Sequence, residues 1–363
     1  MGVLSALLIL ALLVVVHEAG HFLAAVCQGI RVTSFNVGFG PALLQKQRNG
    51  VLYALRLIPL GGFVAFPEDE PDNDIDPRDP DLLKNRPLSQ RGLVIAAGVI
   101  ANVILAWVVL VGQGLVVGIP SGFSATGGVL VTGVQPQQAA ARAGLVPGDT
   151  LIGLNGQPLG GGSTAVQTLV DAVKSSPSQE LQVEIKRQGE TLSVPMIPAD
   201  LGGSGRIGAQ LQPAGVENFR RPANPLEVIS RANRDFAAIW TRTIDGFWTL
   251  ITNFGETASQ VSGPVKIVEM GAQLSEQGGS GLVLFMALIS INLAVLNALP
   301  LPLLDGGQML LLVIEAIRGR PVPERLQLAV AQSGFLLIVG LTLVLIVRDT
   351  SQLSVVQQLM GGR

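Results

Sequence analysis

Four long apolar segments constrain this 363-residue chain more than any other feature. They cover residues 3–26, 93–118, 281–304 and 326–347. Each holds about the 20 apolar residues that a helix needs to cross the hydrocarbon core of a bilayer. Charged residues make up only 14% of the chain, against a share of about 25% in soluble proteins. The sequence therefore predicts an α-helical membrane protein with four transmembrane helices.

The first two segments enclose a run rich in strand-forming residues. The first segment lacks the basic start and the cleavage site of a signal peptide, so we expect it to be retained as a helix. An Asn-Gly pair at residues 49–50 lies inside the strand-rich run at about 35–63 and predicts a β-hairpin. The hairpin is apolar enough to be membrane-associated if its backbone is paired. Residues 1–118 are therefore predicted to form two transmembrane helices and this hairpin.

The middle of the chain has a different character. Residues 122–200 are polar and rich in glycine, with short β-rich runs around one candidate helix, which predicts an inserted soluble α+β domain. Residues 201–280 are expected to form a Gly/Pro linker, up to residue 224, followed by amphipathic helices. These helices are expected either to lie in the bilayer interface or to pack against the soluble domain. Residues 281–350 hold the last two transmembrane helices, and residues 351–363 form a C-terminal tail.

Basic residues indicate the orientation in the membrane. Lys and Arg are concentrated in the 27–92 loop and in the short 305–325 loop. Because cytoplasmic loops carry an excess of Lys and Arg, we expect both loops in the cytoplasm, with the soluble domain and both termini extracytoplasmic. The net charge of −2 provides no basic surface for nucleic acid, so the lipid bilayer is the expected partner and nucleic acid is not.

The first apolar segment contains the sequence HEAGH. His17 and His21 are the only two histidines of the chain, and their spacing of four residues points both side chains the same way on a helix. Two imidazoles at this spacing can bind one zinc ion, with Glu18 beside it as the general base. Ionisable residues inside a membrane span are costly and usually mark function. The motif therefore predicts a zinc-dependent hydrolytic site.

Zinc needs a third protein ligand and an open position for water. Asp305 is the leading candidate, because it ends the apolar run NALPLPLLDGG, in which two prolines break the helix. Glu315 is the second candidate. Cys27 lies six residues after His21, which on a helix points it away from the histidine face. We expect one zinc ion per chain.

Several motifs occur in one order along nearly the whole chain: HEAGH, VGFGP, LIPLGGFVAF, AARAGLVPGDTLIGLNGQPL, SGPVKI and NALPLPLLDGG. Together they resemble the RseP-type site-2 proteases, which are bacterial intramembrane zinc metalloproteases of peptidase family M50. The resemblance implies that His17, His21 and Asp305 bind the zinc and that Glu18 is the catalytic base. It implies that Asn297 helps to hold the substrate strand. It also identifies residues 122–200 as PDZ-like.

The resemblance implies a zinc metalloendopeptidase of the bacterial inner membrane. Such an enzyme hydrolyses peptide bonds within the transmembrane segments of single-pass membrane proteins, such as pre-cleaved anti-sigma factors or remnant signal peptides, in regulated intramembrane proteolysis. The hairpin offers a strand edge for an unwound substrate, and Gly38, Gly40, Gly61 and Gly62 would allow close approach of the backbones. The PDZ groove is expected either to bind a substrate C-terminus or to act as a size filter.

Two other functions are compatible with parts of the sequence. A membrane transporter or metal carrier could use His17, His21 and Asp305 as a pathway, but it would need polar residues along several spans. A non-catalytic PDZ membrane adaptor would have no use for Glu18. The enzyme accounts for all of these residues together.

Overall fold

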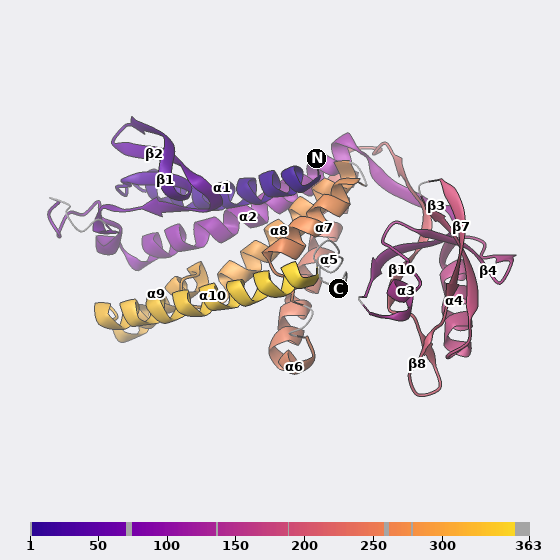
Figure 1. Cartoon of the computed structure of the whole chain (residues 1–363). Helices are drawn as coiled ribbons and strands as arrows, with labels where there is room; N and C mark the ends of the chain where they lie inside the picture. Colours follow the sequence, from indigo (N-terminus) through magenta and orange to yellow (C-terminus); the bar gives the residue numbers. More distant parts are fainter. Residues whose placement is uncertain are drawn as a thin grey trace. The chain divides into compact units, whose positions relative to one another are not determined.

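The computed structural model describes residues 2–69, 75–135, 137–187, 189–257, 261–276 and 279–352. The chain divides into two compact units (Figure 1). Unit 1 comprises residues 1–117 and 222–363, and unit 2 comprises residues 118–221. The predicted C-terminal tail lies, from residue 353 on, outside the described residues.

Unit 1 consists mainly of helices. Its described elements are α1 (Gly2–Cys27), β1 (Ser34–Arg48), β2 (Val51–Ala65), α2 (Leu88–Val116), α5 (Pro225–Thr252), α6 (Phe254–Thr257), α7 (Pro264–Glu276), α8 (Gly279–Ala298), α9 (Asp305–Arg318) and α10 (Glu324–Gln352). Two short 3-10 turns, Pro67–Asp69 and Leu83–Asn85, lie between β2 and α2.

Among the residues that the structure describes, four helices are long and apolar enough to cross a membrane: α1, α2, α8 and residues 325–350 of α10. The predicted number of spans is confirmed. The third predicted span, residues 281–304, was too long, because α8 ends at Ala298 and the proline-containing residues 299–304 form a connection to α9. Proline cannot continue a helix, since it lacks an N–H and its ring clashes with the preceding turn.

The helices of unit 1 pack closely through small residues. A Cβ atom added at Gly20 of α1 would lie 2.8 Å from the Cβ of Ala101 on α2. Ala6 and Leu13 of α1 share a buried cluster with Phe285 of α8. The C-terminal ends of α1 and α8 and the start of α2 lie at the same end of unit 1, next to the hairpin and α9 (Figure 1). This end is referred to below as the loop end.

The hairpin is more than two straight strands. Asn49 and Gly50 both have positive φ, 51° and 80°, as the tight turn between β1 and β2 requires. Residues 34–37 of β1 lie between two parts of β2, with residues 52–55 on one side and residues 62–65 on the other. Among the described residues, no strand pairs with the outer side of residues 62–65.

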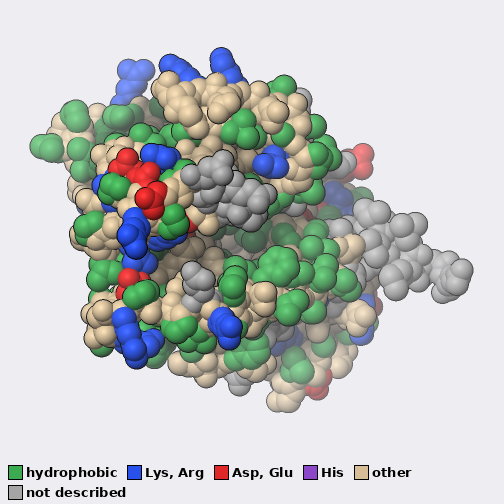
Figure 2. Space-filling model, turned by 90° about the vertical axis from the view of Figure 1, so that its left-hand side faces the viewer, with side chains coloured by type: hydrophobic (Ala, Val, Ile, Leu, Met, Phe, Trp, Pro, Cys, Tyr) green, Lys and Arg blue, Asp and Glu red, His purple; other side chains and the backbone are tan. Residues whose placement is uncertain are grey.

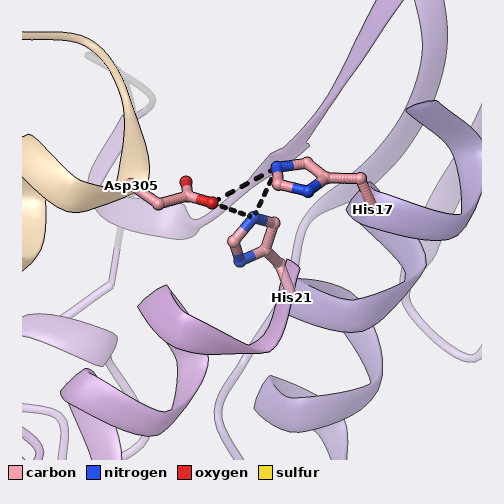
Figure 3. Close-up of side chains that lie close together, drawn as sticks. All are labelled: His17, His21 and Asp305. Carbon is pink, nitrogen blue, oxygen red and sulfur yellow. Dashed lines mark hydrogen bonds and ion pairs between the residues drawn. The ribbon is translucent and has the colours of Figure 1, made fainter. Parts of the chain in front are cut away.

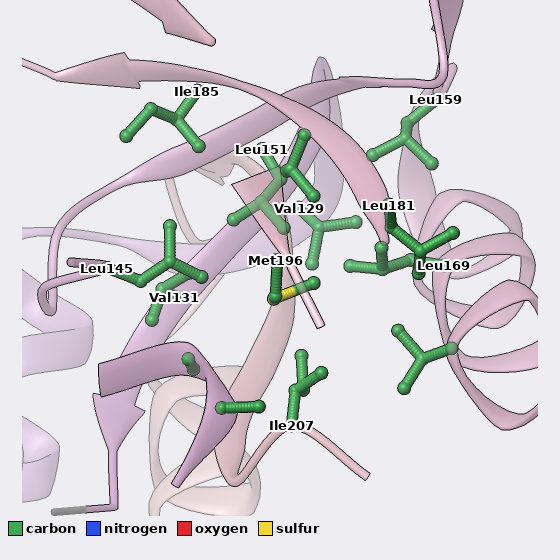
Figure 4. Packing of buried hydrophobic residues seen from close by; sticks show 14 of the residues in the cluster. Val129, Val131, Leu145, Leu151, Leu159, Leu169, Leu181, Ile185, Met196 and Ile207 are labelled. Carbon is green, nitrogen blue, oxygen red and sulfur yellow. The ribbon is translucent and has the colours of Figure 1, made fainter. Parts of the chain in front are cut away.

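Unit 2 is an α+β unit. Its described elements are β3 (Ile119–Val134), α3 (Ala139–Arg142), β4 (Thr150–Leu154), β5 (Gln157–Pro158), α4 (Gly162–Ser175), β6 (Leu181–Arg187), β7 (Glu190–Met196), β8 (Ala199–Asp200), β9 (Gly205–Arg206) and β10 (Ala209–Arg220). The main sheet has the order β10-β3-β4-β6-β7. Ala165, Leu169 and Val173 on one face of α4 belong to its buried core (Figure 4).

The prediction of a linker at residues 201–224 was wrong. This segment contains β9 and β10, and β10 pairs antiparallel with β3 along most of its length. Pro213 does not disrupt the pairing, because the register shifts between Pro213 and Gly215. Proline is tolerated in strands at such irregularities, where no ladder hydrogen bond is needed from its nitrogen. Glycine and proline content alone therefore gave the wrong structure for these residues.

Candidate metal centre

Two helices that are far apart in the sequence bring the predicted metal ligands together. His17 and His21 lie one turn apart on α1, and Asp305 is the first residue of α9. The connection from α8 to α9 is tight, since a Cβ atom at Gly306 would lie 2.5 Å from the carbonyl carbon of Ala298. Only glycine lets the first turn of α9 pack against the end of α8 in this way. The two glycines after Asp305 thus help to place its carboxylate.

The three ligand atoms form a nearly equilateral triangle (Figure 3). The Nε2 atoms of His17 and His21 are 3.3 Å apart. The Oδ2 atom of Asp305 lies 3.3 Å from Nε2 of His17 and 3.5 Å from Nε2 of His21. The His17 side chain is buried, and the side chains of His21 and Asp305 are each 14% exposed. Among the described residues, these three are the group of metal-ligating side chains with convergent ligand atoms.

This triangle fits a tetrahedral zinc ion. With ligands at about 2.1 Å, two neighbouring vertices of the tetrahedron lie about 3.4 Å apart, close to all three distances. Asp305 Oδ2 is also buried without a hydrogen-bond partner, and such an atom is costly unless a proton or metal satisfies it. One vertex is left for water or substrate, as in catalytic zinc sites.

Helix α2 orients the imidazole rings from behind. The Nδ1–H of His21 donates to the backbone carbonyl of Val94 at 2.8 Å, which leaves the Nε2 lone pair free for the metal. A Cβ atom at Gly98 would lie 2.7 Å from Cε1 of either histidine. The rings can therefore occupy this position only because residue 98 has no side chain.

Glu18 lies between the ligands and the hairpin. Its carboxylate is within electrostatic reach of His17, His21 and Asp305, and within hydrogen-bonding reach of the backbone N–H of Val64. A Cβ atom at Gly62 would lie 3.0 Å from Cγ of Glu18. The last part of β2 thus passes directly beside the predicted base.

The other predicted substrate-binding residues are divided. Asn297 is buried near the end of α8, and its Nδ2 lies 3.3 Å from Nε2 of His17. Gly61, with φ of 111°, packs against the ring of Phe39. Gly38 and Gly40, with φ of 89° and 84°, have their close neighbours inside the hairpin rather than at the metal ligands. The structure therefore places Asn297 and Gly62 at the site. Gly38 and Gly40 lie instead within the hairpin, where β1 bends.

The alternative metal ligands lie elsewhere. The carboxylate of Glu315 forms a two-point ion pair with Arg91, with distances of 2.7 Å and 3.1 Å. Cys27 is exposed at the end of α1. Asp305 alone of the three candidates lies with the histidines.

One residue beside the ligands was not predicted to have a role. Asn102 of α2 is fully buried, and its side-chain amide contacts Nδ1 of His17 at 3.3 Å. The only sequence signal was a polar residue in the middle of an apolar span.

Comparison with known proteins identifies the family. The model of peptidase family M50 matches residues 5–341. The chain belongs to this family. Two relatives, each named "Putative zinc metalloprotease", come from Nostoc sp. and Synechocystis sp., and both are 47% identical to the chain. The alignments cover 98% and 99% of this chain and 97% of each relative.

A plant relative extends the comparison to a membrane protein. The "Membrane metalloprotease ARASP, chloroplastic" of Arabidopsis thaliana is 42% identical, over 99% of this chain and 81% of its own length. Membership of family M50, together with relatives named as zinc metalloproteases, identifies zinc as the cofactor. The four apolar helices identify the chain as a membrane protein.

Proposed function

We propose that this chain is an intramembrane zinc metalloendopeptidase of the site-2 type. It hydrolyses peptide bonds within transmembrane segments of single-pass membrane proteins, such as pre-cleaved anti-sigma factors or remnant signal peptides, in regulated intramembrane proteolysis. The observation that carries the proposal is the triangle of His17, His21 and Asp305 beside Glu18. Both histidines and Glu18 lie on α1, an apolar helix of membrane-spanning length. A site at this position acts on substrates that stay in the bilayer.

The residues of the site have distinct tasks. Zinc, when bound by the three ligands, lowers the pKa of a coordinated water and polarises the substrate carbonyl. Glu18 accepts the proton of the attacking water and delivers it to the leaving amine. The amide of Asn297 points toward the same position as the ligand atoms and can donate a hydrogen bond to the carbonyl oxygen.

We propose that residues 62–65 of β2 bind the substrate along their outer edge. A helical substrate hides its carbonyl groups in hydrogen bonds, so it must be extended before cleavage. An extended segment can pair with an unpaired strand edge. This edge is open among the described residues and passes beside Glu18 at Gly62. Strand addition here would bring a scissile carbonyl to the base and the metal.

Substituting Glu18 tests the catalytic proposal. Glu18→Gln keeps the shape of the side chain but cannot accept a proton, so cleavage of a single-span substrate in liposomes should fall about 10²–10⁴-fold. Bound zinc should remain at the wild-type level. Asp245→Asn, which removes an exposed carboxylate of α5, is the control and should cleave normally. Cleavage by Glu18→Gln at the wild-type rate would refute the proposal.

Substituting Gly62 tests the strand edge. In Gly62→Ala, the new Cβ would lie 2.8 Å from the carbonyl oxygen of Asn36 as well as close to Glu18, so the edge must shift. We expect kcat/KM to fall about tenfold or more, equivalent to about 1.4 kcal/mol or more. Gly112→Ala on α2 is the matched control, because its Cβ would meet nothing within 4 Å. Equal activity of the two variants would argue against substrate binding at this edge.

We further propose that the protein lies in the inner membrane of a bacterium and that the loop end of unit 1 is on the cytoplasmic side. Lys and Arg side chains are visible at several places on the face shown in Figure 2, some of them beside Asp and Glu. The two segments at this end, residues 27–92 before the second span and residues 305–325 before the fourth, contain most of the basic residues near the spans. The positive-inside rule then places unit 2 and both termini outside the cytoplasm. This orientation is tested with single cysteines introduced at Asn49 and at Ser178 in a Cys27→Ser background. The measurement is the accessibility of each cysteine to a membrane-impermeant thiol reagent.

Unit 2 is proposed to be a PDZ domain that binds the C-terminus of a cut substrate. Its strand β10 is one of the two edge strands of the main sheet, and α4 packs on β3 and β10, so an added strand could lie between β10 and α4. A labelled peptide with a free carboxylate should bind the full-length protein, and the same peptide with an amidated end should bind at least about tenfold more weakly. Equal binding of both peptides would favour the size filter instead.

A further inference from the structure

Asn102 is the polar residue next to the zinc ligands that the proposed mechanism does not use. It lies in the middle of the apolar helix α2 and is fully buried. Its Oδ1 has no hydrogen-bond partner, while its Nδ2 faces Nδ1 of His17 at 3.3 Å. An amide in this position is costly within a membrane span unless it has a task. Among the described residues, the polar side-chain contact of Asn102 is with His17, a proposed metal ligand.

The metal determines what His17 needs from Asn102. A neutral imidazole that binds zinc through Nε2 carries its proton on Nδ1, and this N–H needs an acceptor. His21 has such an acceptor in the carbonyl of Val94. For His17, the atoms next to Nδ1 belong to the Asn102 amide. An N–H donor in that place supports the opposite tautomer, which carries its proton on Nε2 and cannot bind zinc there.

We propose that Asn102 is a positioning residue that turns its Oδ1 to accept the Nδ1–H of His17 when zinc is bound. Rotation of the amide by about 180° exchanges its oxygen and nitrogen at the same location. The turned amide fixes the tautomer and the ring plane of His17 for coordination. The opposite orientation, with Nδ2 donating to Nδ1, suits the metal-free site.

The surroundings of Asn102 support this task. Gly98 lies one turn earlier on the same face of α2, where it leaves room for both imidazole rings. The backbone carbonyl of Asn102 accepts a hydrogen bond from Oγ of Ser290 at 2.8 Å, so α8 holds this part of α2 in place. The inference rests on the zinc site of the proposed function, but not on the substrate or on cleavage.

Zinc affinity tests the proposal without any substrate. Asn102→Leu has a similar size and cannot accept, whereas Asn102→Asp can. In the purified full-length protein, with a chelating dye as competitor, Asn102→Leu should bind zinc about 10–100-fold more weakly, the usual effect of losing such a partner. Asn102→Asp should stay within about threefold of wild type. Asn292→Leu, which removes another amide of a membrane helix that is paired with Thr243, is the control and should bind normally.

Nuclear magnetic resonance of the ring nitrogens provides a second readout. The chain has only two histidines, so ¹⁵N-histidine labelling gives few signals. In the zinc-loaded protein both rings should carry their proton on Nδ1. Asn102→Asp should move the Nδ1–H signal of His17, because a charged acceptor forms a stronger hydrogen bond, and leave the signal of His21 in place. This measurement decides the question even if Asn102→Leu fails to fold.

Three results would overturn the proposal. They are wild-type zinc affinity in folded Asn102→Leu, equal weakening in the Leu and Asp variants, or an unchanged His17 signal in Asn102→Asp. None of them depends on proteolysis, so they are distinguishable from a failure of the proposed function, which would appear as zinc-loaded protein that does not cleave.

Discussion

At the scale of single residues, the metal centre depends on the absence of a side chain at residue 98. In Gly98→Ala, the new Cβ would collide with the imidazole rings of His17 and His21. We expect zinc affinity to fall at least about tenfold, because the ligand triangle must open, while the helix itself is favoured by alanine. Metal content after dialysis against a weak chelator measures this. Gly112→Ala, on the same helix with nothing near its Cβ, should keep full zinc, and equal loss in both variants would contradict the explanation.

Leu303 has a strained backbone two residues before Asp305. Its φ is 72°, in the left-handed region that side chains other than glycine rarely adopt, and its side chain is 45% exposed. Leu303→Gly should therefore raise the free energy of unfolding by about 0.5–1 kcal/mol. Thermal unfolding of the detergent-solubilised protein measures the change. Leu301 is 42% exposed and has no positive φ, so Leu301→Gly should destabilise the protein instead.

The residues of the site differed in how well the sequence could predict them. His17, Glu18 and His21 were evident because their local spacing carries the chemistry. Asp305 was accessible because the prolines and glycines around it mark a break in an apolar run. Asn102 gave only a weak signal, a polar residue in an apolar span, because its proposed role depends on which residue of another helix it faces. Such contacts between helices are set by packing, which a single sequence does not display.

At the scale of elements, one ion pair joins the two helices that support the site. Arg91 at the start of α2 pairs with Glu315 on α9 through two contacts, and both side chains are less than one quarter exposed. A double-mutant cycle with Arg91→Gln and Glu315→Gln should give a coupling energy of about 1–3 kcal/mol. The more exposed pair Arg231–Asp235 within α5 is the control and should give less than about 0.5 kcal/mol. Equal coupling energies in both pairs would show that the Arg91–Glu315 pair does not contribute more to the packing of α2 and α9 than a surface ion pair would.

The elements themselves were partly predictable. Hydropathy located the four spans, and the Asn-Gly turn located the hairpin, because both signals are local. The strand β10 was missed because its pairing partner β3 lies much earlier in the chain, and its glycine and proline conceal its tendency to form a strand. Residues 34–37 pair with two separate parts of β2. This pairing depends on how the whole hairpin folds, so no short sequence pattern predicts it.

At the scale of the whole molecule, the stability of unit 2 should depend on pH through a buried carboxylate, Asp149. Burial raises the pKa of Asp149, but hydrogen bonds from Arg187 and from the N–H of Val146 outweigh this and hold the pKa below its usual value. A carboxylate with a lowered folded pKa stabilises the fold fully above its unfolded pKa of about 3.9, and this contribution is lost as the pH falls through the folded pKa. We therefore expect unit 2 to lose stability below about pH 4.

Hydrogen exchange of residues 118–221 in the full-length protein, from pH 7 down to pH 3, measures this loss after correction for intrinsic rates. Asp149→Asn should be less stable at pH 7, by about 1–3 kcal/mol, and should show a smaller change with pH. Glu190→Gln, which removes an exposed carboxylate of the same unit, should behave like wild type. An unchanged pH response in Asp149→Asn would assign the acid sensitivity to other groups.

The separation of the ligands along the chain has a consequence for biosynthesis. His17 and His21 leave the ribosome early, whereas Asp305 follows only after the third membrane helix. At about 5–20 residues per second, the histidines wait on the order of tens of seconds for their carboxylate. A nascent or truncated chain has the base and two ligands but no complete zinc site. The proposed protease activity can therefore begin only when most of the protein has been made.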